Sequence, residues 1–140
     1  MTSPSQRILL VDDDEIDRIT IKRALVKSSR PMVVFEATGF SEAIRLLKRQ
    51  RFDCVLLDYR LGGQDGLDLI KEIHTEGLSD APIVMLSGMD DETTRLNCLK
   101  EGAQDFLLKS EVDTHSLVRA IRYAEERKSV TLQIRYLAQH

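Results

Sequence analysis

Glycine, proline and cysteine are scarce in this 140-residue chain, which has seven, three and two of them respectively. So little glycine and proline excludes a low-complexity or disordered chain. Cys54 and Cys98 lie within apolar patterns and lack the spacing of a zinc site, so we expect buried free thiols rather than a disulfide. No apolar run approaches the roughly 18 residues of a membrane helix, and residues 1–7 lack the apolar core of a signal peptide. These absences predict a cytoplasmic protein.

An excess of charge of one sign is also missing. The formal net charge of -3 gives no overall electrostatic reason to bind nucleic acid or an anionic membrane, so neither is expected as a direct partner. Hydrophobic residues make up 42% of the chain and charged residues 31%, as in ordinary globular proteins. At 140 residues the chain has the length of one domain that folds by itself.

Short apolar runs alternate with amphipathic segments along the chain. The runs have the length of strands buried on both faces, and they cover residues 8–11, 32–35, 54–57, 83–86 and 106–108. The segments between and after them predict helices over residues 14–28, 41–49, 66–76, 91–101 and from 113 onward. Apolar residues at helical spacing indicate these helices, such as Ile16 and Ile19 in the first and Leu96 and Leu99 in the fourth.

This alternation of strands and helices predicts an α/β fold with a doubly wound parallel sheet. Right-handed crossovers between parallel strands put helices on both faces of the sheet, which fits strands that are apolar throughout. Ligands of such sheets bind beyond the carboxyl ends of the strands, where the strand order reverses. The residues that follow each strand are therefore the candidates for a functional site.

Polar residues stand at four of the five predicted strand ends. They are Asp12, Asp13, Asp14 and Glu15 after the first strand, Asp58 after the third, Ser87 and Gly88 after the fourth, and Lys109 after the fifth. Each alone has an ordinary explanation as a helix cap, a solvated loop, a turn or a surface lysine. Together, at one edge of one sheet, they predict a site.

Carboxylates crowd this predicted site. If Asp12, Asp13 and Asp58 converge, two carboxylates about 4 Å apart repel by on the order of 4 kcal/mol at an effective dielectric constant near 20. A cation relieves that repulsion, and hard oxygen ligands suit Mg²⁺, which also takes a phosphate oxygen. A lysine and a hydroxyl opposite the acids suit the oxygens of a phosphoryl group. The pattern therefore predicts a phosphoryl group on Asp58.

Four stretches of the sequence resemble the CheY-like receiver domain of response regulators in two-component signalling. They cover residues 8–13, residues 54–58 with 65–67, residues 82–88 and residues 102–109. The resemblance implies a flavodoxin-like five-stranded sheet in the strand order 2-1-3-4-5. It also implies a module that accepts phosphoryl from a histidine kinase or phosphotransfer protein and switches a partner or dimer interface. Such a module is not an enzyme beyond its own phosphorylation and slow dephosphorylation.

The resemblance also implies a role for each acidic residue. Asp58 is the phosphoacceptor. Asp13, with Asp12 assisting partly through water, holds Mg²⁺ together with Asp58 and the backbone carbonyl of Arg60.

The remaining roles that the resemblance implies concern the phosphoryl group and the switch. Ser87 hydrogen-bonds a phosphoryl oxygen, Gly88 leaves the site open and offers its backbone N–H, and Lys109 pairs with the phosphoryl group. Phe106 resembles the switch aromatic, which turns inward when Ser87 is drawn toward phosphate. That change would be a population shift between two packings.

Arg60 and Met89 stand two residues beyond the acceptor and two beyond the hydroxyl residue. We hypothesise that they set the lifetime of the phosphoryl group by controlling where a hydrolytic water can stand.

The sequence departs from the family pattern in three places. Glycines 62 and 63 stand where proline commonly follows the acceptor loop, which predicts a more mobile loop. Ser110 replaces the proline after Lys109, which predicts a trans bond or a strained one there, and a shifted loop, because a cis bond without proline costs roughly 3 to 4 kcal/mol. Phe106 lacks the hydroxyl of the commoner tyrosine, so its switching must act through packing.

The last predicted helix continues beyond the receiver, which we assign to residues 1–128. A heptad-like pattern, in which residues recur at alternating intervals of four and three, begins just before the extension at residues 129–140 and runs into it. We call this pattern the seam, and it consists of Tyr123, Arg127, Val130, Ile134 and Leu137. The seam fits either a homodimerising helix or an ordinary terminal one. Residues 136–140 also resemble the linker into GGDEF-type diguanylate cyclase domains, so a cyclic-dinucleotide enzyme could follow this chain.

Three other functions fit parts of the pattern. An aspartyl-phosphate hydrolase usually has an acid two residues after its nucleophile, where this chain has Arg60. A flavodoxin-like electron carrier needs N–H groups and hydroxyls after the first strand, where this chain has four acids. A receiver-like module that binds partners without phosphorylation would not need the complete set of acids, hydroxyl and lysine.

Overall fold

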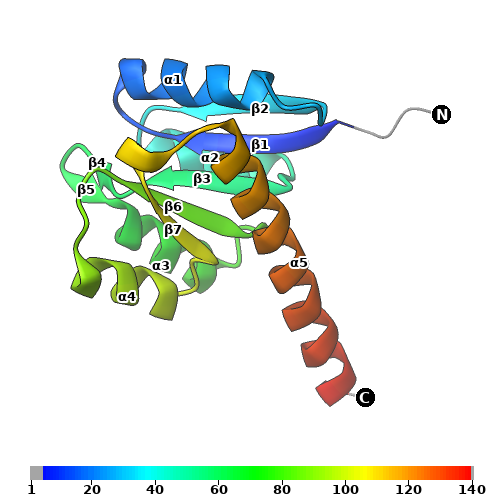
Figure 1. Ribbon diagram of the computed structural model, residues 1–140. Helices are drawn as coiled ribbons and strands as arrows, with labels where there is room; N and C mark the ends of the chain where they lie inside the picture. Colours follow the sequence, from blue (N-terminus) through cyan, green and yellow to red (C-terminus); the bar gives the residue numbers. More distant parts are fainter. Residues whose placement is uncertain (1–4, 140) are drawn as a thin grey trace.

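The computed structural model describes residues 5–139 and has a central parallel sheet (Figure 1). Its strands are β1 Gln6–Val11, β2 Met32–Ala37, β3 Cys54–Asp58, β6 Ile83–Ser87 and β7 Asp105–Leu108. The helices are α1 Glu15–Val26, α2 Phe40–Arg49, α3 Gly66–Glu76, α4 Glu92–Lys100 and α5 Thr114–Gln139. The sheet order is β2-β1-β3-β6-β7, which is the predicted 2-1-3-4-5 when the five sheet strands are counted along the chain.

Two apolar layers sandwich this sheet, as the doubly wound prediction requires. Along β1, the side chains of Leu9 and Val11 enter one layer and those of Ile8 and Leu10 enter the other, because successive side chains of a strand point to opposite faces. Helices α2, α3 and α4 cover the first layer, and α1 and α5 cover the second. Cys54 and Cys98 are both buried and free, as predicted.

The prediction that all five strands are buried on both faces is correct only for the centre of the sheet. Every residue of β3 and β6 is buried, whereas most residues of β2 and all of β7 are partly exposed. Each of these two strands lies at an edge of the sheet and has only one neighbouring strand. An edge strand is therefore less covered even when its sequence is equally apolar.

The apolar residues that indicated two of the helices do not mark their buried faces. In α1 the inward residues are Ile21 and Leu25, while Ile16 is 74% exposed. Five residues correspond to about 140° of helical rotation beyond a full turn, so Ile16 cannot share the face of Ile21. In α4 only Cys98 is buried, and Leu96 is 55% exposed.

A short antiparallel hairpin follows directly after β3. It pairs β4 Arg60–Leu61 with β5 Gln64–Asp65 across a two-residue glycine turn in which Gly62 has a φ of 68°. Only glycine adopts that φ without strain, so this glycine makes the tight turn possible. The greater mobility predicted for this loop stays a prediction.

The bond between Lys109 and Ser110 is trans, as the sequence predicts, since the described residues contain no cis peptide bond. Lys109 begins a single turn of 3-10 helix, η1 Lys109–Glu111. That turn lies directly after β7, so the lysine is held at the same edge of the sheet as Asp58.

Helix α5 has 26 residues and two different parts. Its first part packs on the sheet through four buried residues that lie in the same apolar layer, namely Leu117, Ala120, Ile121 and Ala124. Its second part extends away from the body of the molecule (Figure 1). Among the described residues, no helix has both the length and the apolar character that crossing a bilayer demands.

Candidate functional site

Polar side chains are buried at only one place in the described part of the chain. Asp12, Asp58 and Ser87 are 0%, 5% and 4% exposed, and they lie at the carboxyl ends of β1, β3 and β6. The parallel register brings these ends together, because Val11 pairs with Leu57 and Asp58 pairs with Leu86. The strand ends therefore converge at the edge of the sheet that the sequence predicts for a ligand.

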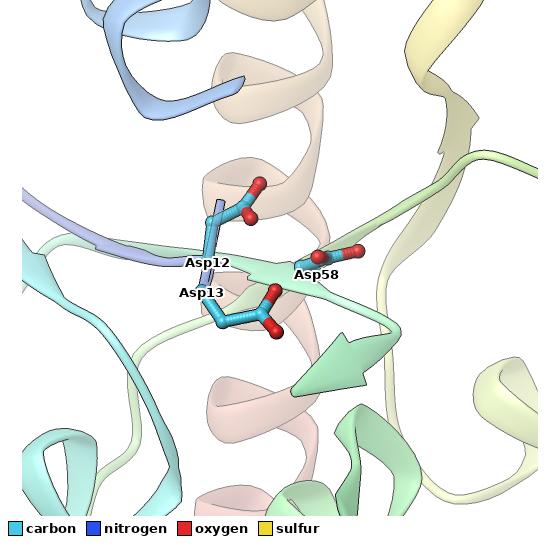
Figure 2. A group of neighbouring side chains, drawn as sticks. All are labelled: Asp12, Asp13 and Asp58. Carbon is cyan, nitrogen blue, oxygen red and sulfur yellow. The ribbon is translucent and has the colours of Figure 1, made fainter. Parts of the chain in front are cut away.

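Three carboxylates meet at this edge (Figure 2). One oxygen from each of Asp12, Asp13 and Asp58 lies within 4.8 Å of the others. Asp12 and Asp58 are buried, whereas Asp13 is exposed and leaves the cluster open to solvent. Such an all-oxygen donor set with one open side fits a hard divalent cation that keeps part of its water, as Mg²⁺ does.

The ammonium group of Lys109 joins these carboxylates from the end of β7. Its Nζ lies 3.0 Å from Asp12 Oδ2 and 3.1 Å from Asp58 Oδ2. The remaining carboxylate oxygens have backbone donors, since the N–H of Asp14 donates to Asp12 Oδ1 at 2.9 Å and that of Arg60 to Asp58 Oδ1 at 3.4 Å. One cation is thus shared by two buried acids, which leaves the cluster negative.

Burial and the neighbouring negative charge both act on the pKa of Asp58. Burial, followed by the neighbouring charge of Asp12, raises the pKa of Asp58 to about 7, although Lys109 acts in the opposite direction. For Lys109, burial alone would lower the pKa, but hydrogen bonds to Asp17 and Asp12 outweigh it and the pKa is raised. Lys109 is therefore a permanent cation, and Asp58 lacks enough positive charge around it.

Ser87 lies at the site but its hydroxyl is turned to the following loop. The Oγ donates to the backbone carbonyl of Met89 at 3.0 Å and accepts from the N–H of Met89 at 3.1 Å. A Cβ at the neighbouring Gly88 would meet nothing within 4 Å, so the space beside the loop is open. A hydrogen bond from Ser87 to a group on Asp58 would require this local pair to open.

Arg60 and Met89, whose backbone N–H groups donate to Asp58 and Ser87, also contact each other through their side chains. The guanidinium of Arg60 donates to the sulfur of Met89 at 3.1 Å. Both residues are exposed, and Met89 is 54% exposed. The two predicted tuning residues therefore form one pair, while their effect on hydrolysis stays a prediction.

Phe106 lies one strand away from Ser87. It is partly buried and packs against the apolar layer under α2, α3 and α4. It also lines a hollow of about 470 Å³ together with residues of α4 and α5, among them Arg95 and Arg119. The ring thus stands between the core and the surface, and its predicted switching stays a prediction.

Three residues that the sequence prediction missed support the cluster. Asp17 accepts a hydrogen bond from Lys109 at 2.6 Å, and Arg18 donates to the backbone carbonyl of Asp12 at 2.9 Å. A Cβ at Gly66 would lie 2.7 Å from the backbone oxygen of Asp58, so only glycine lets α3 begin there. Asp17 stands in the first turn of α1, three residues after the N-cap Asp14, and its place at the start of a helix that follows the acidic run was the available signal for it.

Comparison with known proteins agrees with this geometry. The family model of the response regulator receiver domain matches residues 8–122. The two-component response regulator ORR3 of Oryza sativa subsp. indica is 34% identical over 108 residues, which cover 76% of this chain and 81% of that protein. The chain therefore belongs to the response regulator receiver domain family.

Solved structures agree in fold. A response regulator protein from Burkholderia pseudomallei, with a phosphorylated aspartic acid, a calcium ion and citrate, is 27% identical, with a TM-score of 0.75 over 92% of this chain and 75% of that one. A receiver domain from Vibrio parahaemolyticus has a TM-score of 0.81 at 21% identity, over 94% of this chain and 98% of that one. The predicted fold and the role of phosphoacceptor module in two-component signalling are confirmed at the level of the family.

Proposed function

We propose that Asp58 accepts a phosphoryl group from a phosphohistidine on a partner histidine kinase or phosphotransfer protein. A carboxylate oxygen of Asp58 attacks phosphorus, a P–O bond forms, and the P–N bond breaks with its electron pair going to the departing imidazole. The observation that carries this proposal is the convergence of Asp12, Asp13 and Asp58 within 4.8 Å, with Lys109 Nζ 3.1 Å from Asp58.

The chain's own residues give each charge a partner in this reaction. Lys109 pairs with a phosphoryl oxygen through the ammonium that now contacts Asp58, and Ser87 and the N–H of Gly88 donate to the others. Asp13, Asp58 and the carbonyl of Arg60 would hold Mg²⁺, with Asp12 assisting partly through water. The metal supplies positive charge that offsets the phosphoryl oxygens when it is bound.

The modified state would differ from the free one in the Ser87 loop. Drawing the Ser87 hydroxyl toward phosphate breaks its two contacts with Met89, which are 3.0 and 3.1 Å long. The loop then shifts and leaves room for Phe106 to turn inward. Since Phe106 has no hydroxyl, the two states are distinguished by packing, and the phosphoryl contacts bias their populations.

Arg60 and Met89 would set the lifetime of the phosphoryl group. Both side chains are exposed and adjoin Asp58 and Ser87 through their backbones, so they could control where a hydrolytic water stands. Dephosphorylation rates of Arg60→Ala and Met89→Ala should therefore differ from that of the wild type, and unchanged rates in both variants would contradict this role.

We further propose that residues 1–128 form the receiver and that residues 129–140 form an extension through which two copies pair. The extension is helical to Gln139, and Val130, Ile134 and Leu137 of its seam are 54%, 61% and 64% exposed. Paired copies would bury these side chains. A GGDEF-type output beyond this extension, a signalling rather than enzymatic role for this module, and a cytoplasmic location belong to the same proposal.

Phosphorylation of the protein with acetyl phosphate and Mg²⁺ tests the chemistry. Intact mass should show a gain of one phosphoryl group, because Asp58 at the end of β3 is the one proposed acceptor and lies 3.1 Å from the Lys109 ammonium. The gain should disappear in Asp58→Asn and persist in Asp53→Asn, which changes an aspartate just before the same strand. Phosphorylation of Asp58→Asn would refute the proposal, and sizing of the same samples tests the dimer.

A further inference from the structure

Lys109 has a third carboxylate partner that lies outside the metal cluster. Its Nζ is 2.6 Å from Oδ2 of Asp17, compared with 3.0 Å to Asp12 and 3.1 Å to Asp58. Asp17 lies in the first turn of α1, and it is not among the three acids whose oxygens converge. The shortest ion pair of the lysine is therefore made to a residue for which the phosphorylation chemistry has no assigned role.

We propose that Asp17 is a positioning residue that holds Lys109 and so balances the affinity of the site for Mg²⁺ against its affinity for the phosphoryl group. This inference rests on the proposed function of Asp58.

The three partners of Lys109 differ in exposure. The side chains of Asp12 and Asp58 are 0% and 7% exposed, whereas that of Asp17 is 36% exposed and that of Lys109 is 19% exposed. The ammonium donates hydrogen bonds to Asp12 at 3.0 Å and to Asp17 at 2.6 Å, and it forms an ion pair with Asp58 at 3.1 Å. The lysine thus bridges the buried acids and the solvent-facing start of α1.

The ion pair between Asp17 and Lys109 should strengthen the binding of Mg²⁺ and weaken the interaction of Lys109 with a phosphoryl group. Lys109 competes with Mg²⁺ for Asp12 and Asp58, and Asp17 weakens that competition by attracting the ammonium toward α1. The negative charge of Asp17 also attracts the metal directly. For the transferred phosphoryl group the sign reverses, because Asp17 occupies one N–H and offsets part of the positive charge that would meet the phosphoryl oxygens.

Asp17→Asn therefore separates the two effects. The amide keeps a similar shape and an oxygen acceptor but removes the charge. We expect Mg²⁺ to bind about threefold more weakly and, at saturating Mg²⁺, acetyl phosphate to modify Asp58 about threefold faster, which is the size of effect typical of one partly exposed ion pair. In that reaction the P–O bond to acetate breaks and a P–O bond to Asp58 forms.

The matched control is Glu15→Gln, which removes one exposed negative charge from the same turn of α1 and changes no partner of Lys109. Asp17→Glu restores the charge and should return both quantities toward the wild-type values. The readouts are Mg²⁺ titration without any phosphodonor, intact mass against time, and thermal unfolding as a check of folding.

Opposite shifts in Asp17→Asn that exceed those of Glu15→Gln support the inference. Equal shifts in the two variants, or a loss of both Mg²⁺ affinity and rate in Asp17→Asn, overturn it, because a merely structural defect weakens both. If the wild type itself gains no phosphoryl group, the proposed function fails instead. The two failures are thus distinguishable in one set of samples.

Discussion

Charged side chains lie at both ends of the sheet strands, which we call the amino edge and the carboxyl edge, but they are arranged differently there. At the amino edge, where β1 and β3 begin, the N–H of Arg7 donates to Asp53 at 2.7 Å, and Arg30 lies 3.9 Å from Glu125 of α5. At the carboxyl edge, three carboxylates converge and Lys109 is the cation within ion-pair distance of the buried two. At the amino edge Asp53 and Glu125 thus each have a partner within the fold, while the carboxyl edge leaves charge for a ligand to balance.

The shape of the surface does not reveal this difference. A wide hollow of about 800 Å³ lies at the amino edge, lined by residues that include Arg51, Asp53, Glu125 and Lys128. The converging acids are recognised by their burial and mutual distances instead. Electrostatic imbalance thus identifies the functional edge better than cavity volume does.

Removing the cation of the carboxyl edge should have the largest effect. Lys109→Met takes away the ammonium that faces Asp58 at 3.1 Å, so phosphorylation by acetyl phosphate should slow by about 100-fold. Arg30→Met, which removes a cation of the amino edge, should leave this rate unchanged. Rates are measured by intact mass at saturating Mg²⁺, and similar rates in the two variants would break the comparison.

The second largest effect should be a difference between the two edges in how a substitution changes the stabilisation of the fold by Mg²⁺. At a concentration about thirty times its Kd, Mg²⁺ should raise the free energy of unfolding by about 2 kcal/mol. Asp13→Asn should lose this gain without disturbing the core, because Asp13 is exposed. Asp53→Asn at the amino edge should keep it. Urea unfolding with Mg²⁺ or with a chelator measures both, and a full gain in Asp13→Asn would count against the metal site.

A smaller effect of pH is expected at the amino edge. Burial raises the pKa of Glu125, although Arg30 and Gln6 act to lower it and Asp53 adds to the rise. A carboxyl group whose pKa is higher in the folded state stabilises the fold below its unfolded pKa. That contribution is lost as the pH rises through the folded value.

Glu125→Gln should remove this loss, which begins near the ordinary pKa of glutamate and grows as the pH rises above it. The new amide can also donate to Oε1 of Gln6, a buried oxygen without a hydrogen-bond partner. We expect a gain of about 0.5–1 kcal/mol at neutral pH. Thermal unfolding across this pH range measures it, and parallel pH curves for variant and wild type would argue against a strained Glu125.

The sequence contains the alternation of strands and helices and the identity of the acids at the strand ends, because both follow from local apolar runs, whereas the order of the strands in the sheet is implied only by the family resemblance. Asp12, Asp58 and Lys109 could therefore be paired before any coordinates were known. The buried faces of the helices could not be predicted in the same way. Ile16 and Leu96 fit a helical period, but which face turns inward depends on how each helix docks on the sheet.

The orientations of the side chains at the site could not be predicted from the sequence either. The hydroxyl of Ser87 is directed to the backbone of Met89, and the ammonium of Lys109 reaches Asp17 as well as the predicted acids. Rotamers of this kind are selected by contacts among residues far apart in the sequence, 92 positions in the case of Lys109 and Asp17. Strand-end patterns name the participants of a site but not their hydrogen-bond partners.

Helix α5 is continuous from the part that packs on the sheet to the part that projects from it. The helix packs on the sheet beside α1 through residues that include Ala120 and Ala124, and the fifteen or so residues beyond Ala124 extend for about 22 Å. The helix rises about 1.5 Å per residue along its axis, so a tilt of about 5° at Ala124 would move the far end of this segment by about 2 Å. A small rearrangement beside the sheet is thereby amplified mechanically at the distal end.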